Sequence, residues 1–125
     1  MDLTPLMPAE RQVIEAYGSG GFRVSGTVHT GSIIVLPDAT TPWPVASPDA
    51  LDIASLAAVI AAEPPVELLL VGFGARMAMV PVALREELRT CGIVIEAMDT
   101  GAACRTYNVL LAEERRIAAA LIAVA

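Results

Sequence analysis

The feature that most constrains the fold of this chain is a strand–helix–strand pattern over residues 66–96. Residues 66–71 form an apolar run with a single glutamate, which is typical of a strand covered on both faces. A helix is expected to begin at Pro81 and to end at Gly92, with an apolar stripe formed by Leu84, Leu88 and Cys91. Residues 93–95 predict the next strand. Such a βαβ unit has parallel strands and a right-handed crossover.

The first third of the chain has the pattern of short strands separated by turns. Residues 13–17, 22–28 and 33–36 are rich in apolar side chains, and glycine and serine lie between them. Connections this short favour an N-terminal antiparallel meander, because a parallel crossover needs about a dozen residues or more. Residues 1–10 are expected to form an irregular N-terminal arm, and the proline-rich residues 37–48 an irregular loop that is neither strand nor helix.

Two helices are expected outside the βαβ unit. The first begins at Ser47, an N-cap residue followed by proline, and ends at Pro64. The second is capped by Asp99 or Thr100, and its end is open. Alanine-rich sequence could continue this helix to the C-terminus, or residues 117–124 could return as a buried strand. The chain shows no internal repeat, and residues 1–125 are expected to form a single α/β domain.

Composition and charge exclude several classes of protein. With 55% hydrophobic and 18% charged residues, the chain does not have the composition of a disordered protein. Its net charge of -6 makes nucleic acid an unfavourable partner. Two cysteines are too few for a disulfide scaffold and indicate a reducing compartment. The sequence shows no signal peptide and no apolar run of about 20 residues. We therefore expect a cytoplasmic protein without a membrane span.

The candidate site lies where the two parallel strands of the βαβ unit end. The carboxyl ends of such strands meet at one edge of the sheet, where ligands bind in open α/β folds. The helix that follows directs its free backbone N–H groups to that edge. We predict a small concave site for a carboxylate, a phosphate or a partner's acidic side chain, formed by Gly72, Phe73, Gly74, Arg76, Asp99, Thr100, Arg105 and Asn108. The alternative is that Asp99 and Thr100 only cap the helix and that both arginines are solvated.

The spacing of the glycines disfavours a dinucleotide site at the same place. Met77 stands where the dinucleotide fingerprint has a third glycine after Gly72 and Gly74, and the helix begins only at Pro81. No pair of cysteine or histidine residues has metal-binding spacing. We therefore expect neither a cofactor nor a metal.

Cys104 and two aromatic residues carry further hypotheses. Cys104 lies near a helix N-terminus, which favours a thiolate, and His29 and Asn108 could complete a nucleophilic arrangement. Packing of Cys104 in the core is the favoured alternative. Trp43, in the proline-rich loop, and Phe73, between two glycines, are candidate anchors for a protein partner. For Trp43 we favour closure of one end of the core, and for Phe73 both interpretations are open.

The C-terminal half of the chain carries a resemblance to a known family. The segment Met98-Asp99-Thr100, residues 103–110 with Asn108, and residues 113–121 contain its most specific part, and the similarity extends over most of residues 12–123. These segments resemble a small uncharacterised family that includes the mitochondrial NADH dehydrogenase (complex I) assembly factor 3 and many bacterial and archaeal proteins.

The resemblance implies a three-layer α/β domain with a central mixed β-sheet. It implies that the helix after Thr100 ends near Glu114 and that residues 116–122 form the last strand, which runs antiparallel. Family members have a small polar residue where this chain has Phe73, and a glycine where it has Glu114. The family has no established catalytic residues, and its eukaryotic member acts by binding partners during assembly of a membrane complex.

Three functions follow as expectations. The first is a non-catalytic binding or assembly module with a protein partner that belongs to a membrane complex. The second is an enzyme or a binder of small anions that uses the edge formed by residues 72–76 and 99–105; the sequence leaves catalysis open and does not favour it. The third is a homo-oligomer that buries apolar surface against a second copy of the chain.

Overall fold

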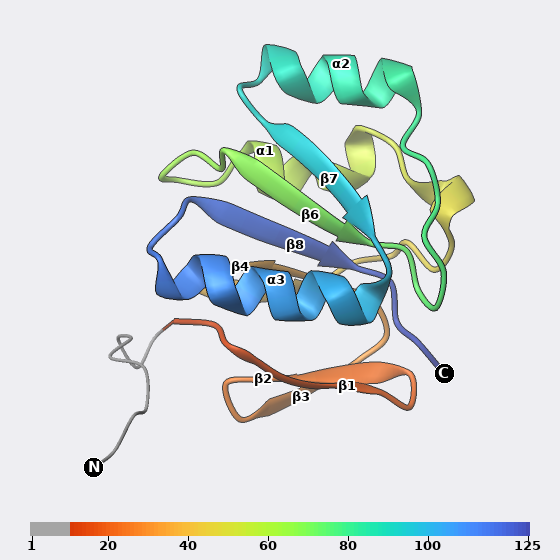
Figure 1. Cartoon of the computed structure of the whole chain (residues 1–125), viewed down its shortest axis with the longest axis vertical. Coiled ribbons are helices and arrows are strands. Elements are labelled where there is room, and N and C mark those ends of the chain that lie inside the picture. Colours follow the sequence, from red (N-terminus) through yellow and green to blue (C-terminus); the bar gives the residue numbers. More distant parts are fainter. Residues whose placement is uncertain (1–10) are drawn as a thin grey trace.

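Residues 11–125 are described by the structure, a computed structural model, and they contain two β-sheets (Figure 1). The larger sheet has the order β5-β4-β8-β6-β7 and consists of β4 (Ile33–Leu36), β5 (Ala39–Pro42), β6 (Leu68–Gly72), β7 (Val94–Met98) and β8 (Ile117–Leu121). The smaller sheet is antiparallel, in the order β1-β2-β3, and consists of β1 (Ile14–Gly18), β2 (Gly21–Val24) and β3 (Thr27–Thr30). The arm expected at residues 1–10 lies outside the described residues.

The predicted βαβ unit is confirmed. Strands β6 and β7 are parallel neighbours, and α2 (Val82–Thr90) connects them. Leu84 and Leu88 are the buried residues of α2, and Gly92 follows the helix with a φ of +79°, a conformation that glycine adopts without strain. The prediction for Cys91 is wrong: it lies at the C-cap and is exposed. The helix ends before Cys91 can extend the buried stripe.

The C-terminal segment is a strand, as the resemblance implies. Helix α3 (Thr100–Ala112) ends two residues before Glu114, and β8 then enters the middle of the sheet. Strand β8 is antiparallel to β4, and it is also parallel to β6. Residues 117–122 are all buried. Alanine favours helices, so burial between two neighbouring strands overrides the local preference of residues 118–120.

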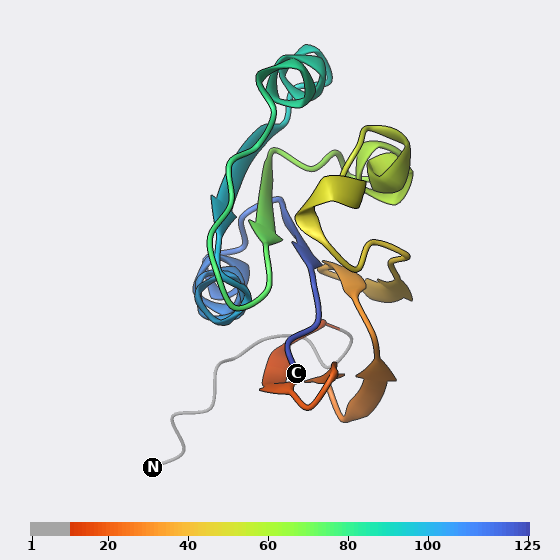
Figure 2. The ribbon, with the colours of Figure 1, turned by 90° about the vertical axis from the view of Figure 1, so that its right-hand side faces the viewer.

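Helices and strands form three layers, as Figure 2 shows edge-on. Alternate residues of β6 and β8 point to opposite faces of the larger sheet. On one face, Leu69 and Ala118 pack with side chains of α1 (Ala57–Ile60) and α2. On the other face, Leu70 and Ala119 pack with side chains of α3 and of the smaller sheet. Burial on both faces explains the continuous apolar run of β6.

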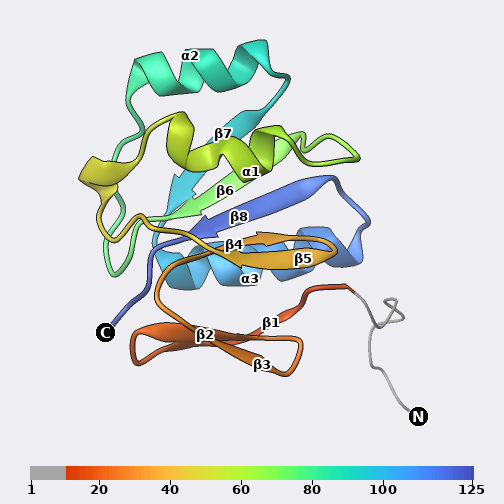
Figure 3. The same ribbon diagram turned by 180° about the vertical axis from the view of Figure 1, so that it is seen from behind.

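The proline-rich segment contains a strand, so the prediction of an irregular loop over residues 37–48 is wrong for part of its length. Residues 39–42 form β5, which pairs antiparallel with β4 at the edge of the larger sheet (Figure 3). Pro42 is the last residue of β5, and an edge strand tolerates a residue without an N–H group. Strand β4 was expected in the N-terminal meander with β1, β2 and β3, but it belongs to the larger sheet, where it lies beside β8.

The helix predicted from Ser47 is broken. Only two 3₁₀ turns, Pro48–Ala50 and Ala54–Leu56, and the four residues of α1 are helical. The Ser47 side chain forms no capping hydrogen bond. At the second turn, the Ser55 N–H donates to Asp52 Oδ1 at 2.8 Å and the Ser55 hydroxyl donates to the Asp52 carbonyl at 2.7 Å. Such local side-chain bonds compete with a continuous helix.

Within residues 11–125, no helix has both the length and the apolar character that crossing a membrane requires.

Candidate functional site

The predicted edge exists, and it brings the two strand ends together. Gly72 of β6 lies opposite Met98 of β7, and the Phe73 N–H donates to the Met98 carbonyl at 2.9 Å. The Thr100 N–H donates to the Gly74 carbonyl, also at 2.9 Å. The loop after β6 and the first turn of α3 are therefore in direct contact.

Thr100 closes this edge with its side chain. It is fully buried, and its hydroxyl accepts a hydrogen bond from the Gly74 N–H at 2.9 Å and donates one to the Ile122 carbonyl at 2.7 Å. The Ile122 N–H donates to the Gly72 carbonyl at 2.9 Å. A Cβ atom on Gly72 would lie 2.8 Å from the Thr100 Cα, so the two backbones are packed without a gap. The contacts join three chain segments and leave no room for a ligand between Gly72 and Thr100.

The N-terminus of α3 is capped by its own chain. Asp99 Oδ1 accepts from the Ala102 N–H at 2.9 Å, as the capping alternative predicts. The Ala103 N–H donates to the Asp99 carbonyl, and a side chain on Gly101 would collide with the Tyr17 hydroxyl. The N–H groups of Thr100, Ala102 and Ala103 therefore already have acceptors. At this edge the structure shows the helix capping by Asp99 that the alternative expects.

The two predicted arginines lie outside this closed contact. Arg76 and Arg105 are exposed, and neither forms an ion pair with a residue in the described range 11–125. Arg105 lines a shallow groove between β1 and α3, together with Tyr17 and Asn108.

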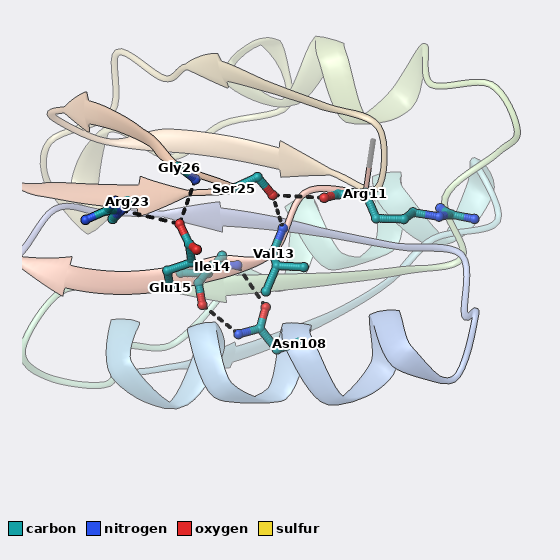
Figure 4. A network of polar contacts seen from close by, with 8 residues as sticks. All are labelled: Arg11, Val13, Ile14, Glu15, Arg23, Ser25, Gly26 and Asn108. Carbon is teal, nitrogen blue, oxygen red and sulfur yellow. Dashed lines mark hydrogen bonds and ion pairs between the residues drawn. The ribbon is translucent and has the colours of Figure 1, made fainter. Parts of the chain in front are cut away.

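Asn108 binds the backbone of β1. Its Oδ1 atom accepts from the Ile14 N–H at 3.0 Å, and its Nδ2 atom donates to the Ile14 carbonyl at 2.7 Å (Figure 4). The same strand contacts the β2–β3 turn and β2 itself. The Glu15 carboxylate accepts from the Gly26 N–H in the turn and pairs with Arg23 of β2 at 3.5 Å. Asn108 therefore attaches the smaller sheet to α3, and both ends of its amide are occupied.

Replacing Asn108 with alanine is expected to lower the free energy of unfolding by about 2 kcal/mol, because the Ile14 N–H and carbonyl lose their partner in a part-buried position. Thr106→Ala on the same helix is the matched control and should change stability by less than about 0.5 kcal/mol. Urea denaturation measures both changes. Faster hydrogen exchange confined to β1–β3 should accompany N108A, and equal stability of the two variants would contradict the role of this contact.

Trp43 and Phe73 are core residues, so the hypothesis that they anchor a partner does not fit their positions. They are 3% and 4% exposed and belong to the cluster that packs with α1 and α2. Trp43 Nε1 donates to the Ser55 carbonyl at 2.8 Å. Trp43 closes the core, as favoured, and Phe73 turns inward although it lies between two glycines.

Cys104 has the properties of a packing residue. Burial raises the pKa of its thiol to about 12, so the thiol stays protonated at neutral pH. A nucleophilic cysteine needs the opposite shift. Among residues 11–125, no group of three histidine, cysteine or carboxylate side chains is placed to hold a metal ion.

Sequence reasoning missed a cavity at the opposite end of the larger sheet. It has a volume of about 390 Å³ and lies between the β4–β5 turn, residues 62–66 and residues 114–117, with Arg11 at its wall. The paired prolines before β6 and the paired arginines before β8 are the signals in the sequence. They are far apart along the chain, and only the strand order brings them together.

Comparison with known proteins places this chain among relatives with the same fold. It is 42% identical over 109 residues to an uncharacterised protein of Rhodobacter capsulatus, with 87% of this chain and 82% of that protein covered. It is 40% identical over 110 residues to the Danio rerio protein named NADH dehydrogenase (ubiquinone) 1 alpha subcomplex assembly factor 3, with 88% of this chain covered. The match spans 63% of the zebrafish protein, less than two thirds of its length.

A solved structure supports the same relationship. The crystal structure described as an outer membrane protein from Bartonella henselae superimposes with a TM-score of 0.85 at 39% sequence identity, covering 94% of this chain and 98% of that one. The family model described as "Protein of unknown function (DUF498/DUF598)" matches residues 14–122. The chain therefore belongs to the DUF498/DUF598 family.

Proposed function

We propose that this chain is a cytoplasmic, non-catalytic binding module that acts in the assembly of an NADH dehydrogenase complex by binding a protein partner. The observation that carries the proposal is the 40% identity to the zebrafish assembly factor 3 over 88% of this chain. The chemistry of the predicted edge is consistent with it, because Thr100 is committed to backbone hydrogen bonds and the thiol of Cys104 stays protonated. Both observations support a structural role for these residues.

The loop between β6 and α2 offers a surface for such a partner. Met77 and Met79 are 69% and 89% exposed, while Ala78 and Val80 between and beside them pack against the core. This alternation directs both methionine side chains outward, and Val82 at the start of α2 adds a third exposed apolar side chain. Flexible methionine side chains suit a binding surface that adapts to its partner. The loop is the green segment on the right of Figure 1.

The proposal predicts that a tagged chain purified from its host retains subunits or assembly factors of the NADH dehydrogenase complex. The double variant Met77→Ser and Met79→Ser should lower this recovery at least about tenfold, a loss that a few buried apolar contacts account for. Val28→Ser is the matched control, because Val28 is also an exposed apolar residue (73% exposed) and lies on β3 of the smaller sheet. Quantitative mass spectrometry measures recovery, and thermal unfolding confirms that all variants fold.

Each outcome has a separate meaning. If the unaltered chain recovers no component of that complex, the proposed function is wrong; recovery of only a second copy would indicate a homo-oligomer instead. If the double variant and the control recover the complex equally, the proposed function stands, but the loop with Met77 and Met79 is not the surface that binds the partner.

A further inference from the structure

The cavity at the amino ends of β6 and β8 has the dimensions of a site for a small molecule. Its volume of about 390 Å³ is within the usual range for ligand pockets. Four segments that are distant in the sequence form it, and they meet at the end of the sheet where the β4–β5 turn lies (Figure 3). It is at the opposite end of β6 from the closed contact between Gly72 and Thr100.

The walls of the cavity are largely apolar and rigid. Leu36, Val66 and Ile117 contribute aliphatic side chains, and Pro64 and Pro65 contribute rings with restricted backbones. Val66 and Ile117 are 5% and 0% exposed, so they belong to the packed core. A preformed apolar wall favours the hydrocarbon part of a ligand.

The charged groups of the cavity define which ligand charge it can accept. Arg11, Arg115 and Arg116 line it, together with Asp38, Glu63 and Glu114. This equal number of opposite charges disfavours a polyanion. Arg116 is paired with Glu67 at 3.0 Å, whereas Arg11 and Arg115 form no ion pair with any residue from 11 to 125.

The Arg11 backbone is held by a hydrogen bond, and its guanidinium forms no ion pair with another residue of the described range 11–125. Its carbonyl accepts a hydrogen bond from the Ser25 hydroxyl at 2.9 Å. Figure 4 shows the Arg11 side chain extending away from this network, with the guanidinium apart from the other side chains drawn. A planar guanidinium presents two parallel donors that match a carboxylate.

We propose that this cavity binds a monocarboxylate with a short aliphatic chain. The carboxylate accepts hydrogen bonds from the Arg11 guanidinium, and the aliphatic chain packs against Pro64, Val66 and Ile117. The inference is independent of the assembly role and of the Met77–Met79 surface.

The test is an NMR titration of the full chain with octanoate, with octanol and octylammonium as probes that lack the carboxylate. Octanoate should cause saturable shifts at the amides of Val66 and Ile117 and leave Gly74 and Thr100 unchanged. Arg11→Gln should weaken binding at least about tenfold, the loss expected for a charge-assisted contact. Arg89→Gln is the matched control, because Arg89 is an exposed arginine on α2 that pairs with Glu86.

Three results would overturn the proposal. One is the absence of saturable shifts at Val66 and Ile117 with octanoate. Another is equal binding of octanol or octylammonium, which would show that the carboxylate is not recognised. The third is equal binding by R11Q and R89Q; if R11Q does not fold, Arg11→Lys takes its place, because lysine keeps the charge and removes the two parallel donors.

Discussion

Replacing Thr100 with valine is expected to lower the free energy of unfolding by about 2–4 kcal/mol. Valine has nearly the same shape as threonine, so packing at this fully buried position is kept. The change removes the hydroxyl that accepts from the Gly74 N–H and donates to the Ile122 carbonyl. Each of these backbone groups would then be buried without a partner, which costs about 1–3 kcal/mol per group.

Thr100→Ser is the matched control for this prediction. Serine keeps the hydroxyl and removes one buried methyl group, which should cost about 1 kcal/mol. Urea denaturation of T100V and T100S separates the two contributions. A T100V variant as stable as T100S would show that the hydroxyl does not hold the three segments together.

Gly72→Ala is expected to destabilise the protein by about 2–3 kcal/mol or more. An added Cβ would lie 2.8 Å from the Thr100 Cα, 2.9 Å from its Oγ1 and 3.1 Å from the Leu121 side chain. The first of these atoms is backbone and belongs to α3, so relief requires the helix to move away from β6. Such a shift also breaks the hydrogen bonds of the Thr100 hydroxyl.

Gly92→Ala provides the comparison for G72A. Gly92 has a φ of +79° and nothing within 4 Å of an added Cβ, so alanine there is strained but not crowded. The expected cost is about 1–2 kcal/mol. Thermal and urea unfolding compare the two variants. If G72A is no less stable than G92A, the close approach of β6 and α3 does not matter for stability.

The residues that sequence reasoning selected as a ligand site are largely residues that hold the fold together. The glycine loop and the Asp99-Thr100 segment meet at one edge, which parallel strand topology dictates. Local pattern indicates that an N-terminus and two strand ends converge there. It does not indicate whether the space between them is open, because that depends on the position of Ile122, the residue that follows β8.

The elements with strong local signals were predictable from the sequence. The apolar run of β6, the stripe of α2 with Gly92 after it, and the Asp99 cap of α3 each depend on neighbouring residues. The resemblance to a family added the end of α3 and the strand that follows it. Both were confirmed within a few residues.

Contacts between distant segments determined the rest. Residues 118–120 are alanines, whose local preference is for a helix. They form a strand because β4 and β6 pair with them on both sides. Residues 39–42 form β5 because β4 provides hydrogen-bond partners despite the prolines nearby. The cavity beside Arg11 depends on four segments separated by up to about a hundred residues. Backbone hydrogen bonding and burial between such segments have no signature in a local window, so their effect on the fold and on the candidate site is visible only once the chain has folded.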